Sequence, residues 1–178
     1  MDEDLDWKYI DIPYIGDEKY RIYKDTTIWS EKSNKYRQES LNAYGYRSIT
    51  LNTKSGYKRY LIHRLYAKAF LPKTETDIKY NRDLVHFKDF DITNITIDNL
   101  EWLNPLELHM LVEIKNSKKE YKRIGDYIEF ICRLLENNYE VEDIISVLRL
   151  KNTIWTRNQI KRIKARKIYV IESAKFEF

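Results

Sequence analysis

The spacing of apolar residues changes along this chain, from strand-like alternation in its first third to helical spacing in its last third. Residues 46–53, YRSITLNT, alternate apolar and polar side chains, and residues 57–63, YKRYLIH, follow after the turn TKSG at 53–56. This period of two is typical of a β-hairpin with one buried face. YRIY at 20–23 and TIWS at 27–30 predict another hairpin, because aromatic and β-branched residues flank the polar segment KDTT.

The middle of the chain predicts two short strands followed by a helix. HRLYAKAF at 63–70 has apolar residues at helical spacing and ends before a proline. LVHF at 84–87 and LEWL at 100–103 have the length of strands and are joined by a polar loop. NPLE at 104–107 is typical of a helix start, with an Asn cap, Pro at the first position and Glu at the third. We expect this helix to continue to about residue 115, which completes a ββα unit.

The last third predicts three helices after a polar linker at 116–125. We expect Asp126 to cap the first helix, residues 141–148 to form the second, and Thr156 to cap the third. The lengths and short connections fit a helix-turn-helix, whose last helix enters the major groove of DNA. A purely structural three-helix bundle is the alternative. The basic character of the third helix alone favours DNA.

These patterns predict an α+β fold. Its expected segments are a small antiparallel β module at 1–62, a ββα core at 63–115, the linker at 116–125 and a helix-turn-helix domain at 126–178.

The net charge of +4 is modest, but the charges are unevenly distributed. Residues 1–18 carry seven acids and one base, whereas residues 156–167 carry six bases and no acid. A basic stretch without acids is a candidate surface for phosphate groups. A merely solvated charged face is the alternative.

Composition also bears on the compartment. No apolar run reaches the roughly 20 residues that span a membrane, and the acidic start MDEDLDW is unlike a secretory signal or transit peptide. The single cysteine, Cys132, lies in an apolar run and is expected to be a small buried side chain, and one Cys with three His fits no familiar zinc spacing. We therefore expect an intracellular protein with no membrane association. Heavy use of Ile, Lys, Asn and Tyr indicates an AT-rich genome.

The chain resembles the HNH homing endonucleases of phages and large DNA viruses, including the strand-rich module that precedes their nuclease core. Beyond residue 125 it is similar to the helix-turn-helix tail that ends many of these proteins. The segments that carry the resemblance are DWKYI (6–10), YRIYKDTTIWS (20–30), GYRSITL (45–51), HRLYAKAFLP (63–72) and DNLEWLNPLE (98–107).

The resemblance implies that the ββα unit holds one divalent metal ion against the scissile phosphate. His86 takes the position of the general base on the attacking water, and Asn94 that of the asparagine that hydrogen-bonds within the loop and holds the histidine. A single hard cation with few protein ligands suits this chemistry, because it stabilises the leaving oxyanion while keeping coordination sites open.

The chain departs from the family at the metal ligands. Val85 stands before the histidine, where the family has Asp or Asn, and Leu108 stands where it has a helical Asn or His. Neither side chain coordinates a cation. His109 is one residue further on, about 100° round the helix, and Asp89 offers a carboxylate after the histidine. A rearranged site would use His109 and Asp89 to hold Mg²⁺ or another divalent cation; without it the protein has no cofactor.

The leading hypothesis is a DNA-binding protein on an HNH scaffold with weak or lost nuclease activity. The alternatives are an active metal-dependent endonuclease with a rearranged site, and a viral structural or interaction protein that reuses the fold. The expected partner is double-stranded DNA, with other viral proteins as a further option, in the host cytoplasm or the virion. The side chains expected to contact DNA are Arg64, Arg157, Asn158, Gln159, Lys161, Arg162, Lys164, Arg166 and Lys167.

Overall fold

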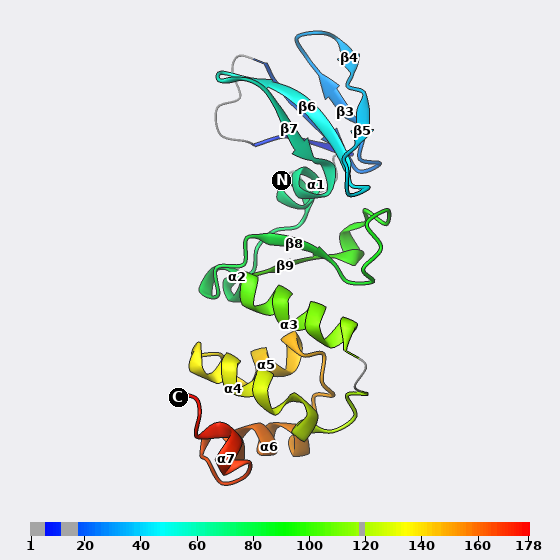
Figure 1. The fold of residues 1–178 in the computed structure, drawn as a ribbon. Coiled ribbons are helices and arrows are strands. Elements are labelled where there is room, and N and C mark those ends of the chain that lie inside the picture. The colour runs from blue at the N-terminus through cyan, green and yellow to red at the C-terminus, as the bar shows by residue number, and fades with distance from the viewer. Residues whose placement is uncertain (1–5, 12–17, 118–119) are drawn as a thin grey trace. The chain divides into compact units, whose positions relative to one another are not determined.

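The computed structural model describes residues 6–11, 18–117 and 120–178, which fall into two compact units. Unit 1 is Met1–Pro105 and unit 2 is Leu106–Phe178. Residues 1–5 and 12–17 of the acidic start and residues 118–119 of the expected linker lie outside the described residues. Strands occur in the blue to green part of the chain and helices make up its yellow to red part (Figure 1).

Unit 1 contains three antiparallel sheets. The first is four-stranded and consists of β1 (Trp7–Tyr9), β2 (Tyr20–Tyr23), β3 (Ile28–Ser30) and β4 (Lys35–Tyr36). The second has the order β5 (Glu39–Leu41), β6 (Arg47–Thr53), β7 (Gly56–Leu61), and the third pairs β8 (Leu84–Phe87) with β9 (Leu100–Leu103). Both hairpins expected from alternation, β2–β3 and β6–β7, are confirmed. Gly56, which closes the second, has φ +94, a conformation that favours glycine.

Two helices accompany these sheets. α1 (Ile62–Phe70) confirms the helix expected at 63–70, and α2 (Glu75–Lys79) is started by a capping box between Thr74 and Asp77. The buried side of α1 joins apolar side chains of the strands in one core. The members of this core include Tyr20, Ile22, Ile28, Ile49, Leu51, Ile62, Leu65, Phe87, Leu100 and Trp102. The core therefore fixes the β8–β9 hairpin against α1.

The β8–β9 hairpin has two different faces. Its register pairs Val85 with Trp102 and His86 with Glu101. Because successive side chains of a strand point to opposite faces, the first pair lies on one face and the second on the other. Trp102 belongs to the core, so the first face is the one that packs in unit 1. The loop between the strands ends in a 3-10 turn, Ile97–Asn99.

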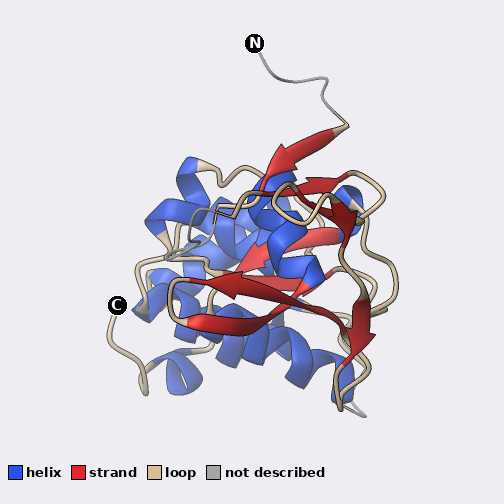
Figure 2. Cartoon of the chain, turned by 90° about the horizontal axis from the view of Figure 1, so that it is seen from above, coloured by secondary structure: helices blue, strands red, loops and turns tan. Residues whose placement is uncertain are grey.

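Unit 2 contains only helices among its described residues. They are α3 (Pro105–Asn116, whose first residue closes unit 1), the 3-10 turn η2 (Ile124–Tyr127), α4 (Ile128–Glu136), α5 (Val141–Val147), α6 (Ile154–Lys164) and α7 (Val170–Ser173). Fully buried side chains from four of these helices form its core: Met110, Ile131, Leu134, Ile144 and Ile160. Helices and strands together confirm the expected α+β class (Figure 2).

Two predicted helix caps are wrong by a few residues. Asp126 does not cap α4, because its carboxylate accepts hydrogen bonds from the backbone N–H of Arg123 (2.9 Å) and of Lys122 (3.1 Å) and so closes the preceding 3-10 turn. Thr156 does not cap α6, because the side chain of Thr153 accepts the hydrogen bond from its N–H at 3.1 Å. Thr156 is therefore the third residue of α6, and its side chain is buried.

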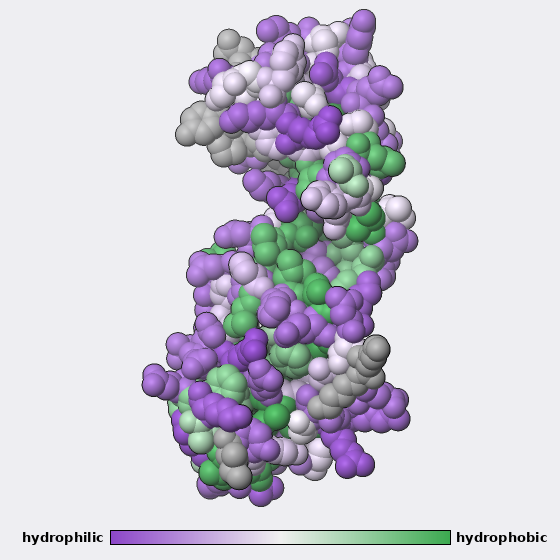
Figure 3. Space-filling model, viewed as in Figure 1, coloured by the Kyte–Doolittle hydropathy of each residue, from purple (hydrophilic) through white to green (hydrophobic). Residues whose placement is uncertain are grey.

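Among the described residues, no helix has the length and apolarity to cross a membrane. Hydrophilic side chains, coloured purple, cover much of the face drawn in Figure 3, as the 34% of charged residues leads one to expect.

Candidate functional site

His86 is held from one side by a carboxylate across the hairpin. Its Nδ1 lies 2.9 Å from Oε1 of Glu101, and its ring meets the ring of Phe90 edge-on with 4.8 Å between centroids. Because a carboxylate only accepts hydrogen bonds, Nδ1 carries the proton of this contact. The ring is 8% exposed, and its Nε2 has no hydrogen-bond partner among the described residues. Nε2 is thus the nitrogen left for a further partner.

Asp89 organises the loop that follows His86. Its Oδ1 accepts hydrogen bonds from the backbone N–H of Asp91 (2.8 Å) and from Nδ2 of Asn99 (2.9 Å), and its Oδ2 accepts one from Nδ2 of Asn94 (2.8 Å). These donors, the Asp91 N–H most of all, lower the pKa of Asp89. Asn99 also donates to the carbonyl oxygen of Asn94 at 2.8 Å. The carboxylate is therefore charged and committed to holding the loop.

Asn94 hydrogen-bonds within this loop, as the resemblance implied, but the side chain within hydrogen-bond distance of the His86 ring is Glu101. Sequence reasoning missed this glutamate and also Asn99, whose side chain is buried in the loop. The signal for Glu101 was present, because antiparallel pairing of LVHF with LEWL places the glutamate opposite the histidine. The catalytic roles of His86 and Asn94 stay predictions.

The carboxylates nearest His86 are already engaged in hydrogen bonds of the hairpin and its loop. Val85 lies on the other face of the hairpin and has no lone pair, and both oxygens of Asp89 accept hydrogen bonds from the loop. In the described part of the chain, no three His, Cys, Asp or Glu side chains gather in a group that could hold a metal ion. His109 lies on α3 of unit 2, exposed, with its Nε2 3.5 Å from Oε1 of Glu113. The metal-ligand roles of Asp89 and His109 stay predictions.

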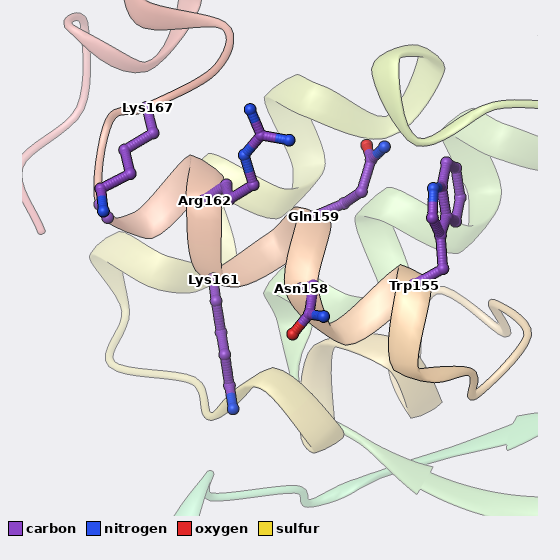
Figure 4. A pocket seen from close by; sticks show the side chains of 7 residues that line it. Trp155, Asn158, Gln159, Lys161, Arg162 and Lys167 are labelled. Atoms are coloured by element: carbon purple, nitrogen blue, oxygen red, sulfur yellow. The ribbon is translucent and has the colours of Figure 1, made fainter.

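The exposed side of α6 carries most of the side chains expected to contact DNA. Thr156, Ile160 and Ile163 are buried, which turns the other side of the helix outward. We call the residues that line the hollow there the α6 surface: Trp155, Asn158, Gln159, Lys161, Arg162 and Lys167. Figure 4 shows Gln159 and Arg162 projecting in one direction from α6, with Asn158 and Lys161 together on another side. Sequence reasoning missed Trp155, which is 61% exposed.

The other expected DNA contacts have different surroundings. Arg157 is directed to α5, where its Nε lies 3.3 Å from Oε1 of Glu142. Arg166 donates to the carbonyl oxygen of Phe176 at 2.7 Å, while Lys164 is exposed at the last residue of α6. Arg64 is exposed on α1 in unit 1. The structure thus gathers Asn158, Gln159, Lys161, Arg162 and Lys167 on one surface and leaves the remaining four elsewhere.

No family model matches the chain. Over 110 residues it is 30% identical to an uncharacterized HNH endonuclease of Acanthamoeba polyphaga mimivirus, a match that covers 62% of this chain and 32% of that protein. The chain therefore spans about a third of the length of this relative. A solved structure of the HNH homing endonuclease I-HmuI, described as DNA binding and cleavage, is 22% identical with a TM-score of 0.49, covering 70% of this chain and 67% of that one.

Among these comparisons, the 30% identical viral protein supports the resemblance to HNH endonucleases, and its source is a large DNA virus, one of the groups in which the resemblance was stated. They give no support to the expected viral protein partners.

Proposed function

We propose that this protein binds double-stranded DNA on an HNH-like scaffold and has weak or lost nuclease activity. The observation that carries the proposal is the α6 surface, where three bases stand beside two amides and an exposed tryptophan. No acid occurs between residues 151 and 171. Lys and Arg neutralise phosphates and supply most of the affinity for DNA, and Asn and Gln form paired hydrogen bonds with adenine.

The proposed docking mode is that of a helix-turn-helix. α4, α5 and α6 are short, pack on shared apolar side chains and are joined by connections of a few residues. In this motif the last helix lies in the major groove with its first residues near the base edges. Asn158 and Gln159 come before Lys161, Arg162 and Lys167 along the chain, which supports base contacts by the two amides and phosphate contacts by the three bases in this docking mode.

The proposal of weak nuclease activity is supported by the surroundings of His86. A general base alone accelerates a reaction by about 10²–10⁴-fold, and the uncatalysed cleavage of phosphate esters is slow enough to need far more. Much of the remaining stabilisation of the transition state has to come from a positive charge placed beside the leaving oxygen. Val85 offers no ligand for a cation that could supply it, and Asp89 is committed to the loop.

A second candidate, an active endonuclease, is favoured by one observation. The His86 ring is buried and held by Glu101, and its Nε2 has no partner among the described residues. A histidine held in this way suits a general base.

Salt-dependent gel shifts test DNA binding. Lys161→Gln and Lys167→Gln, each alone, should weaken duplex binding and reduce the slope of log affinity against log salt by about one. Lys175→Gln is the matched control, because Lys175 is an exposed lysine of the same unit outside the α6 surface. Equal slopes in all four proteins would remove α6 as the DNA contact.

Plasmid nicking tests the nuclease. The wild-type protein with Mg²⁺ or Mn²⁺ should form relaxed circles only slowly, and His86→Gln should lower even this rate. Rapid nicking by the wild type that His109→Ala abolishes would establish the active endonuclease with a rearranged metal site instead.

A further inference from the structure

Unit 1 contains a cavity lined by basic side chains, separate from the surroundings of His86. It is a cavity of about 310 Å³ between β7, α1 and the β8–β9 hairpin. Arg59, Arg64 and Lys68 supply its cations, and Val85 and Trp102 belong to its apolar lining. His86 and Glu101 lie on the opposite face of the hairpin, because alternate residues of a strand face opposite ways.

The three cations have no counter-charge of their own. None of the ion pairs between described residues involves Arg59, Arg64 or Lys68. Asp83, the acid that lines the cavity, already pairs with Lys73. Arg64 and Lys68 are four residues apart on α1, a spacing at which like charges repel each other and destabilise a helix. An anion in the cavity would relieve this repulsion.

Part of the cavity lining is apolar and buried. Trp102 is 7% exposed, and its indole N–H donates to the carbonyl oxygen of Leu71 at 3.0 Å, which fixes the ring. Leu65 is buried beside it. Apolar walls lower the local dielectric constant, so that cations on the rim attract an anion more strongly than they would on an open surface.

We infer that this cavity binds a phosphate group. The planar guanidinium groups of Arg59 and Arg64 match two phosphate oxygens at once, and Lys68 adds a compact positive charge. The group is a backbone phosphodiester of DNA or the phosphate of a free nucleotide, and the inference rests on the proposed function only for the first source. With DNA, each of the two units would supply one phosphate-binding surface.

The rate of acetylation of Lys68 measures occupancy in the intact protein. The protein is treated with an amine-reactive acetyl donor in the presence of inorganic phosphate, a deoxynucleoside 5′-monophosphate or duplex DNA, and each lysine is followed by peptide mass spectrometry. At a ligand concentration about nine times Kd, Lys68 should react roughly tenfold more slowly. Lys54 and Lys58 are internal controls, since both are exposed and neither lines the cavity.

In the double variant Arg59→Gln/Arg64→Gln, the ligand should no longer protect Lys68 from acetylation. In Lys58→Gln, a substitution at a neighbouring residue of the same strand, the ligand should still protect it. Both arginines are exposed, and circular dichroism confirms the fold of each variant. Protection by duplex DNA identifies a backbone phosphodiester; protection by the smaller anions alone identifies a free phosphate.

If Lys68 of the wild type reacts at its unliganded rate with all three ligands, the inference is wrong, whatever the variants do. Retention of duplex DNA in a gel under the same conditions would then leave the proposed function standing, because binding through the α6 surface does not need this cavity.

Discussion

His63 should make the stability of unit 1 depend on pH. The residue is 3% exposed on α1, where its ring lies 5.2 Å from that of Tyr46 and 4.9 Å from that of Phe87. Burial, and to a lesser degree the positive charge of Arg64, lower the pKa of His63 from its usual 6.5 to about 4. Its place between two rings also favours a structural role over contact with a phosphate.

The sign and size of the effect follow from these two values. The unfolded chain protonates His63 below pH 6.5, whereas the folded chain does so only below about pH 4. Between them the unfolded state binds more protons, so the free energy of unfolding falls as the pH falls through this window and is fully retained above it. At about 1.4 kcal/mol per pKa unit, the total loss is about 3 kcal/mol, of which about 2 kcal/mol is lost by pH 5.

Urea unfolding of the wild type and of His63→Phe between pH 7.5 and pH 5 measures this loss. Both proteins should carry Trp155→Phe, so that tryptophan fluorescence reports only on unit 1. Phe keeps the ring between its neighbours and cannot be protonated. The other titrating groups are the same in both proteins and cancel in the difference. The free-energy difference between the two should shift by about 2 kcal/mol in favour of the variant at pH 5; parallel pH profiles would refute this account of His63.

Two further substitutions should show which contacts stabilise each unit separately. Glu101→Ala should lower the free energy of unfolding of unit 1 by about 1–3 kcal/mol, because it leaves the buried Nδ1 of His86 without its partner. Glu101→Gln should restore most of this, since its amide oxygen still accepts, and an equal loss in both would contradict the assigned contact. Thr153→Ala should lower the melting temperature of unit 2 by removing the cap of α6, at a cost of about 0.5–2 kcal/mol. Thermal unfolding followed by the helical signal in far-ultraviolet circular dichroism checks this, because the described residues of unit 2 form only helices, and an unchanged midpoint would reject Thr153 as the cap.

The elements were predictable from the sequence where one periodicity dominates. Alternation in YRSITLNT and YKRYLIH specified a hairpin, and the structure pairs β6 with β7 over six residues in register. The start of α6 was less accessible, because Thr153 and Thr156 are three residues apart and both are good caps by type. The choice between them depends on which threonine has an extended backbone, and that is decided by the packing of the helix.

The candidate site was predictable in its position along the chain and not in its contacts. The sequence indicated His86 in a short strand and Asp89 and Asn94 in the polar loop that follows it. The carboxylate of Asp89 accepts hydrogen bonds from several groups of this loop. These contacts depend on how the backbone turns, and the spacing of residues in the sequence does not predict that. The contact of Glu101 with His86 depends on strand register, and a shift of one residue would have reversed its face.

Because the β8–β9 hairpin has two different faces, a metal ligand introduced at residue 85 would not lie beside His86. A carboxylate introduced at Val85 would enter the cavity beside Arg64 and Lys68 rather than join His86, because it would inherit the orientation of Val85. There it would act as an internal counter-ion and compete with any phosphate. A metal ligand at residue 85 would therefore weaken the binding of a phosphate in this cavity. To bring a ligand at this position to the side of His86, β8 would have to shift its register by one residue, which a point substitution does not readily provide.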